Sequence, residues 1–221
     1  MAGFLMAFAA VPQARAADDS GFYLDASAVR ALHTLDRSDL DGALISAVSS
    51  QAGGSLALDG SSVERDAATW TAGVGYRASA FFAVEASYLD LGQLWYSGSG
   101  TETFSSGPVS LSTVLDVTSK GPALDAVGIL PLLEGLEVSV RAGAFEGKTT
   151  TNFSNTTSNG ADAGSMSKTT TSLLVGVGAS YAFSGHWAAQ VQFVHLNGLQ
   201  ESFLDHKFNV DIATAGLTYM F

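Results

Sequence analysis

The sequence lacks cysteine, and it is short of charge, basic charge in particular. Without a single cysteine among its 221 residues, disulfides, thiolate metal sites and cysteine nucleophiles are excluded. Charged residues make up 14% of the chain, and 10 Lys and Arg stand against 21 Asp and Glu. A net charge of −11 cannot neutralise phosphates, which argues against a nucleic-acid partner. The four histidines show no metal-ligand spacing such as HExxH, and we expect no cofactor.

Long apolar runs are missing as well, although the composition is apolar. Hydrophobic residues make up 47% of the chain, and the mean hydropathy is positive. Yet the body of the sequence contains no run of about 18 uncharged apolar residues, which a membrane-spanning helix would need. The hydrophobic residues are therefore interleaved with small and polar ones, as in strands that have one apolar face. The length fits a single domain.

The N-terminus has the features of a secretory signal peptide. An apolar stretch over residues 3–11 is followed by small residues at Ala14 and Ala16 in the A-x-A arrangement. Cleavage after Ala16 or Ala17 would leave an acidic start at Asp18, so we assign residues 1–17 to the signal and 18–221 to the mature domain. Because the usual basic segment is missing, we expect the signal to be truncated at its start. A buried N-terminal helix is the alternative.

Eight segments of the mature chain alternate apolar and polar residues with a period of two, which predicts strands. In the fifth segment, for example, Val138 and Val140 lie on one face and Ser139 and Arg141 on the other. The eight segments are residues 21–29, 69–77, 82–91, about 111–130, 136–145, 173–183, 186–196 and 210–221. In a soluble barrel the apolar face points inwards and the polar face is rich in charged residues. Here the polar face carries Gly, Ser, Thr and Gln with few charges, which favours an arrangement with the apolar face outside.

The connections between these segments alternate between short and long. Tight links at 78–80, 131–135 and 184–185 follow even-numbered strands, and long ones at about 30–68, 92–110, 146–172 and 197–209 follow odd-numbered strands. Short periplasmic turns and long extracellular loops are typical of bacterial outer-membrane barrels. The sequence therefore predicts an all-β fold, an eight-stranded antiparallel up-and-down transmembrane β-barrel of a Gram-negative outer membrane. A soluble periplasmic barrel is the remote alternative.

Aromatic residues gather beside the predicted short turns and at the chain end, as in the interfacial girdle of a membrane barrel. Ordinary core aromatics of a β-sandwich are the alternative explanation. The residues concerned are Tyr76, Phe82, Tyr181, Phe183, Trp187, Tyr219 and Phe221.

Four stretches resemble the outer membrane protein A-like (OmpA-like) β-barrel family: "GVGYRASAFFAVEASYLDLG", "LDAVGILPLLEGLEVSVRAGA", "GVGASYAFSGHWAAQVQF" and the terminal "GLTYMF". The resemblance implies an eight-stranded barrel. It also implies that Leu217, Tyr219 and Phe221 form the C-terminal signal read by the outer-membrane assembly machinery. It covers all the predicted strands but the first and leaves the long loops unmatched. It does not extend to a periplasmic peptidoglycan-binding domain, so a cell-wall anchoring role is not implied.

Charged residues at lumen-facing positions must pair, because an eight-stranded barrel is only wide enough for its own side chains. The resemblance favours a Glu85–Arg141 ion pair, and Arg77 is placed to pair with Glu137. Such pairs could form a polar gate or simply a plug that fills the barrel, and we favour the plug. The lumen ion-pair candidates are Asp25, Arg77, Glu85, Asp125, Glu137 and Arg141.

These observations predict a cell-surface outer-membrane protein with a structural or surface-interaction role and no enzymatic activity. A narrow porin-like channel for small or hydrophobic solutes is one alternative. A lipid A-modifying enzyme is another, with His195 as the candidate base and Ser87, Asp90 or Ser202 as partners, but parity places His195 on the lipid face. We expect outer-membrane lipid and lipopolysaccharide and the assembly machinery as partners, and a monomer.

Overall fold

The computed structural model describes residues 20–33, 37–52, 54–66, 69–200 and 207–221. The predicted signal peptide, residues 1–17, lies outside these ranges. No helix within them is long and apolar enough to cross a membrane. The elements are β1 (Gly21–His33), α1 (Arg37–Ala52), β2 (Ser55–Asp66), β3 (Thr69–Ser79), β4 (Phe82–Phe104), β5 (Gly107–Leu133), β6 (Leu136–Thr157), β7 (Gly160–Ala182), β8 (Trp187–Gln200) and β9 (Lys207–Met220).

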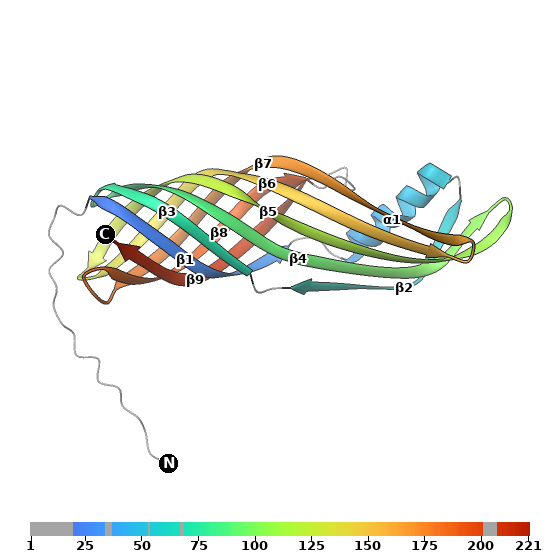
Figure 1. Cartoon of the computed structure of the whole chain (residues 1–221), viewed down its shortest axis with the longest axis horizontal. Coiled ribbons are helices and arrows are strands. Elements are labelled where there is room, and N and C mark those ends of the chain that lie inside the picture. Colours follow the sequence, from blue (N-terminus) through green and yellow to red (C-terminus); the bar gives the residue numbers. More distant parts are fainter. Residues whose placement is uncertain (1–19, 34–36, 53, 67–68, 201–206) are drawn as a thin grey trace, which may run out of the picture.

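Eight strands close into a ring, which confirms the predicted antiparallel barrel (Figure 1). The ring runs β1–β3–β4–β5–β6–β7–β8–β9 and back to β1, and every neighbouring pair is antiparallel. The last strand closes it, because β9 pairs with β1 from Met220 opposite Tyr23 to Val210 opposite His33. Turns at residues 80–81, 134–135 and 183–186 lie at one end of the ring, which we call the short-turn end.

Two of the predicted long loops are in fact continuations of the barrel strands. The predicted loop at 92–110 belongs to a β4–β5 hairpin that pairs up to Phe104 opposite Gly107. The predicted loop at 146–172 belongs to a β6–β7 hairpin that pairs without a register shift up to Thr157 opposite Gly160. These segments are rich in Thr and Ser, and Thr, as a β-branched residue, favours strands even where the sequence is polar. Both hairpins therefore rise well beyond the ring (Figure 1).

The long connection predicted at 30–68 contains α1 and β2. Leu40, Leu44 and Val48 recur at the helical spacing of four residues, and all three are buried. They pack on side chains of β2, β4 and β5 that point to the same side of the extended hairpins, including Leu56, Tyr96 and Leu115. The strand β2 pairs only with the upper part of β4, with a bulge between Leu58 and Gly60. Together these elements form a lobe above the ring.

The outward-facing side chains of the ring form an apolar belt. Large hydrophobic residues on this face such as Phe22, Val140 and Leu217 are 47–61% exposed, as the predicted parity of the strands requires. Charged or polar residues replace them where the belt ends, away from the short-turn end, so the belt has a defined upper border. The residues at that border are Arg30, Asp90, Lys120, Glu146, His195 and Asp211.

The inside of the ring has two chemically different halves. Near the short-turn end the lumen holds all six predicted ion-pair candidates, beside a small apolar cluster of Tyr23, Ala83 and Val127. Towards the hairpins the lumen is filled by an apolar cluster, which we call the plug, and Ala43 of α1 packs against it. The plug consists of Val29, Ala31, Leu89, Leu91, Ala123, Phe145, Leu174, Val194, Leu196, Val210 and Ile212.

Candidate functional site: the barrel lumen

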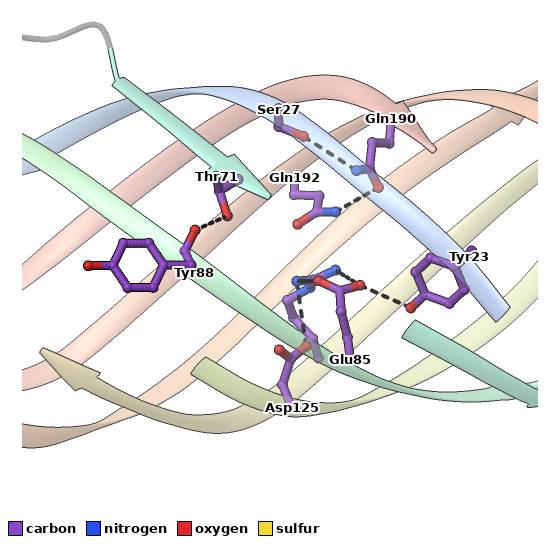
Figure 2. Close-up of polar contacts among 9 residues, drawn as sticks. Tyr23, Ser27, Thr71, Glu85, Tyr88, Asp125, Gln190 and Gln192 are labelled. Atoms are coloured by element: carbon purple, nitrogen blue, oxygen red, sulfur yellow. Dashed lines mark hydrogen bonds and ion pairs between the residues drawn. The ribbon is translucent and has the colours of Figure 1, made fainter. Parts of the chain in front are cut away.

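A single guanidinium, that of Arg141 on β6, lies at the centre of the polar half. Its Nη1 is 3.2 Å from Oε1 of Glu85 and 3.5 Å from Oδ2 of Asp125. The hydroxyl of Tyr23 donates a hydrogen bond of 3.0 Å to Oε2 of Glu85. Figure 2 shows Tyr23, Glu85 and Asp125 turned into the lumen from β1, β4 and β5. The structure thus brings Glu85 and Arg141 together, and it adds Asp125 and Tyr23 to the same layer.

Glycines in the neighbouring strands make room for this layer. The ring of Tyr23 lies directly over Gly75, where any side chain would collide with it. Gly143 lies equally close to Asp125. Gly75 of β3 and Gly143 of β6 therefore serve close packing inside the lumen.

With Asp25 and Asp125, the acidic side chains of this layer outnumber its single cation, Arg141. Asp25 is 7% exposed, and its Oδ2 has no hydrogen-bond partner among the described residues. Neither oxygen of Asp125 accepts a hydrogen bond from a described residue, although Oδ2 is within ion-pair distance of Arg141. With Glu85, three carboxyl groups thus share the interior with Arg141, which makes the guanidinium indispensable to the layer.

A second ion pair lies at the short-turn end. Arg77 of β3 donates two hydrogen bonds to the carboxylate of Glu137 on β6, of 3.1 and 2.9 Å. Its guanidinium also donates to the backbone oxygens of Ser79 and Ala80. The structure therefore joins the two residues that the sequence placed near each other, and the same arginine fixes the β3–β4 turn.

Two cavities separated by the Arg141 layer occupy the polar half. The lower one has a volume of about 80 Å³ and extends from Arg77 and Glu137 up to Glu85 and Arg141. The upper one, about 20 Å³, reaches the underside of the plug. Both are lined in part by Glu85, Arg141 and Gln192, so these side chains separate them. At about 30 Å³ per water, the lower cavity is large enough for two or three waters and the upper one for at most one.

Sequence reasoning expected ion pairs to fill the lumen and did not predict the apolar plug, and it placed glutamines on the polar face without predicting their hydrogen bonds. The side chain of Gln192 donates to Gln190, which in turn donates to Ser27 of β1, at 2.8 and 3.3 Å (Figure 2). The plug could have been found from the same alternation of inward and outward positions that identified the ion pairs. On β1 the inward positions change from Asp25 and Ser27 to Val29, and other strands change in the same way.

The predicted girdle residues lie around the short-turn end, on the outer face. Tyr181, Phe183, Trp187 and Phe221 are between 43% and 73% exposed. Tyr219 links the closing strand to its neighbours, because its ring lies 4.9 Å from that of Trp187 and 5.2 Å from that of Phe221. The two remaining members, Tyr76 and Phe82, are also exposed and lie beside the β3–β4 turn.

The sequence matches the OmpA-like transmembrane domain over residues 41–221, a range that includes seven of the eight ring strands. The chain belongs to this family. The OmpA-like barrel is therefore a protein of the bacterial outer membrane, which it crosses with its strands, and its apolar belt faces lipid.

Several solved structures are similar to this OmpA-like barrel, whereas no curated protein matches it. Ail, the attachment invasion locus protein of Yersinia pestis, is 15% identical, with 91% of this chain and 97% of that chain covered and a TM-score of 0.45. OprG of Pseudomonas aeruginosa is 13% identical, with 92% and 97% covered and a TM-score of 0.45. AlkL is 15% identical, with 98% and 97% covered and a TM-score of 0.47.

His195 lies on the outer face of the OmpA-like barrel, at the upper border of the belt. Its Nδ1 is 2.6 Å from Oδ1 of Asp211, which is directly opposite it on β9. Ser87 lines the upper lumen cavity instead, and Oδ1 of Asp90 accepts a hydrogen bond from the backbone of Gly92. Ser202 falls outside the described residues. The structure therefore does not bring His195 together with Ser87, one of the partners considered for it.

Proposed function

We propose that this OmpA-like barrel is a structural and surface-interaction protein whose lumen does not conduct. The observation that carries the proposal is the plug, because its eleven apolar side chains pack together inside the upper part of the ring. Phe145 and Leu196 are completely buried there, and the facing residues come from β1, β4, β5, β6, β7, β8 and β9. A dry apolar constriction opposes the passage of water and ions.

Closure has three successive layers in this proposal. The Arg141 layer separates the two small cavities of the polar half, the plug fills the lumen above it, and Ala43 of α1 packs on the plug from the hairpin side. An ion would therefore lose its hydration twice, once at a crowded charge layer and once in an apolar region. The rest of the chain forms the hairpins and the lobe, and in this proposal these parts contact other molecules.

In this proposal the hairpins project from the cell and the short turns face the periplasm. The test uses single cysteines in a chain that has none: Ser106→Cys and Ser158→Cys at the hairpin tips, and Glu134→Cys in a short turn. All three positions are exposed. A membrane-impermeant maleimide should label the two tips on intact cells, and Glu134→Cys only after the outer membrane is permeabilised. Labelling of Glu134→Cys on intact cells would contradict the orientation.

A narrow channel is the second candidate, because the lower cavity is polar and large enough for water. Liposome swelling with small sugars and amino acids distinguishes the two functions. We expect no swelling above that of empty liposomes, since the plug lies in the path. Swelling that depends on solute size would favour the channel.

We also propose that the protein is not an enzyme. His195 has Asp211 as its neighbour on the outer face, and Ser87 is on the other side of the barrel wall. Mass spectra of lipid A from cells with and without the protein should be identical. An altered acyl pattern would overturn this part of the proposal.

The proposed partners are the surrounding outer-membrane lipid, including lipopolysaccharide, and the assembly machinery, which would recognise Leu217, Tyr219 and Phe221. Phe221 is 73% exposed, and its backbone N–H donates to the carbonyl of Phe22 on β1. We expect Phe221→Ala to lower the amount of assembled, heat-modifiable barrel in cells. The control is Phe183→Ala, which removes an aromatic of similar exposure from the same girdle. Equal losses in both variants would indicate a general need for girdle aromatics instead.

A further inference from the structure

The extended hairpins and β2 form a sheet above the ring that has two free edges. In this region the strand order is β2–β4–β5–β6–β7, and β7 joins β8 only from Leu173 opposite Asn197 downwards. Among the described residues, nothing pairs with the outer edge of β7 between Gly160 and Ser172. Alternate residues of such an edge turn unpaired N–H and C=O groups outwards, and these groups form a template for another strand.

The two edges differ in how they are protected. The edge at β2 is interrupted by the bulge between Leu58 and Gly60 and carries exposed acidic side chains at Asp59 and Glu64. Bulges and charges of this kind are what proteins use to prevent edge pairing. The edge at β7 has no bulge in its pairing with β6 and no proline, and Ala161, Ala163 and Gly164 add no bulky side chains to it. Of the two edges, the β7 edge is therefore the one that runs without a bulge, and its charges, unlike the acidic pair on β2, have both signs.

The charges on the β7 edge are self-complementary. Asp162 and Lys168 lie three residues on either side of Ser165 and point to the same face of the strand. Neither forms an ion pair with another described residue. If a second copy pairs antiparallel with its own β7 edge, centred on Ser165, each Asp162 lies directly opposite the Lys168 of the other copy. Opposite charges at such cross-strand positions are stabilising.

We propose that this edge binds the same edge of a second copy of the chain that is anchored in a facing membrane. Pairing through the same edge makes the two strands antiparallel, so the two barrels point in opposite directions. Copies inserted side by side in one membrane run in the same direction and cannot form this pair. The protein thus remains a monomer within its membrane and joins two cells. The inference rests on the proposed orientation, with the hairpins outside the cell.

Cross-linking tests the register. Cells carrying Ser165→Cys with one epitope tag are mixed with cells carrying Ser165→Cys with another tag, and a mild oxidant is added. The two-fold axis places both introduced thiols opposite each other, so a disulfide-linked dimer with both tags is expected. The matched control is Ser154→Cys, an exposed position opposite Ala163 on β6, which the pair does not bring together. The proposal is overturned if Ser165→Cys gives no more mixed dimer than Ser154→Cys.

Charge exchange tests the complementarity. Asp162→Lys and Lys168→Asp each place like charges opposite each other in a pair of identical copies. We expect cell–cell association to fall roughly tenfold for each variant alone, because two attractive pairs become repulsive. Cells with Asp162→Lys mixed with cells with Lys168→Asp should associate like the unmodified protein. Failure of the mixture to recover would contradict the register. Tip labelling at Ser158→Cys verifies the orientation separately. If the tip is labelled but the unmodified protein gives no cell–cell association, this inference is refuted while the proposed orientation stands.

Discussion

The two halves of the lumen are built on the same strands but are filled in physically different ways. On β4, for example, Glu85 faces the polar half, whereas Leu89 and Leu91, a few residues further on, belong to the plug. The polar half leaves cavities and depends on matched charges, whereas the plug has its members buried to 8% exposure or less. In the proposed function, closure of the lumen therefore depends mainly on the plug, and the charged layer fixes how the strands meet below it.

The largest effect is expected from removing the central cation. Arg141→Met leaves Glu85 and Asp125 buried without a counter-charge, which should lower the free energy of unfolding by about 3–5 kcal/mol. Urea unfolding in lipid vesicles measures this value. In the control, Arg141→Met is combined with Glu85→Gln and Asp125→Asn, which removes the charges together and should recover most of the stability. A single variant as stable as the unmodified barrel would show that the layer is not held by charge.

A truncation in the plug tests the other half. Leu196→Ala should cost about 2–5 kcal/mol, because it removes packed methyl groups and leaves a cavity. An apolar cavity of this kind stays dry, so no ion leak is expected. The companion variant Leu196→Ser places a hydroxyl in the same space, which favours entry of water. Barrels with Leu196→Ser should therefore leak more ions than barrels with Leu196→Ala. Equal leaks from both variants would contradict closure by an apolar region.

Loosening α1 tests whether the plug needs its cap. The hydroxyl of Tyr96 donates a 2.6 Å hydrogen bond to Asp41 of α1, and Ser61 of β2 donates to the same carboxylate. Tyr96→Phe should cost about 0.5–1.5 kcal/mol, seen as faster hydrogen exchange in α1. The lumen should stay closed, because the plug residues come from the ring. A leak in this variant would make α1 part of the closure.

The same tyrosine gives the lobe a pH dependence. Burial, together with the hydrogen bond to Asp41, raises the pKa of the Tyr96 hydroxyl above its ordinary value of 10.0. The resulting stabilisation is complete below pH 10, where both folded and unfolded chains hold the proton, and it is lost as the pH rises towards the pKa of the folded protein. Hydrogen exchange in α1 should therefore increase above pH 10 in the unmodified protein and change less in Tyr96→Phe.

The smallest effect is expected for the lumen glutamines. Gln190→Ala removes hydrogen bonds to Ser27 and Gln192, but water from the lower cavity can replace them. We expect a change of about 1 kcal/mol or less in urea unfolding. A much larger loss would mean that the polar half is as tightly packed as the plug.

Sequence periodicity was sufficient for the barrel and for its two faces. The alternation of apolar and polar residues showed which residues point inwards. Because the closed ring is narrow, each of the few inward charges has only a few oppositely charged side chains within reach. This is why Glu85 and Arg141, and Arg77 and Glu137, could be named in advance. Parity alone did not show which acidic residue pairs with Arg141. The family resemblance indicated Glu85.

The parts above the ring were less accessible to sequence reasoning. The β6–β7 hairpin reads as a polar loop, because neither of its faces is apolar enough to give a period-two signal. Its strands form through Thr-rich pairing that continues the ladder below. The plug was missed for a different reason: apolar residues on both faces at the upper ends of the strands blur the alternation, as around Leu173 and Leu174.

Single-channel recording of the unmodified protein in planar lipid bilayers tests the closed lumen most directly. Leu196→Ser serves as the comparison, because it should admit water where the plug is driest. The account predicts no unitary current for the unmodified protein and a measurable leak for the variant. A clear unitary current from the unmodified protein, unchanged by Leu196→Ser, would contradict it.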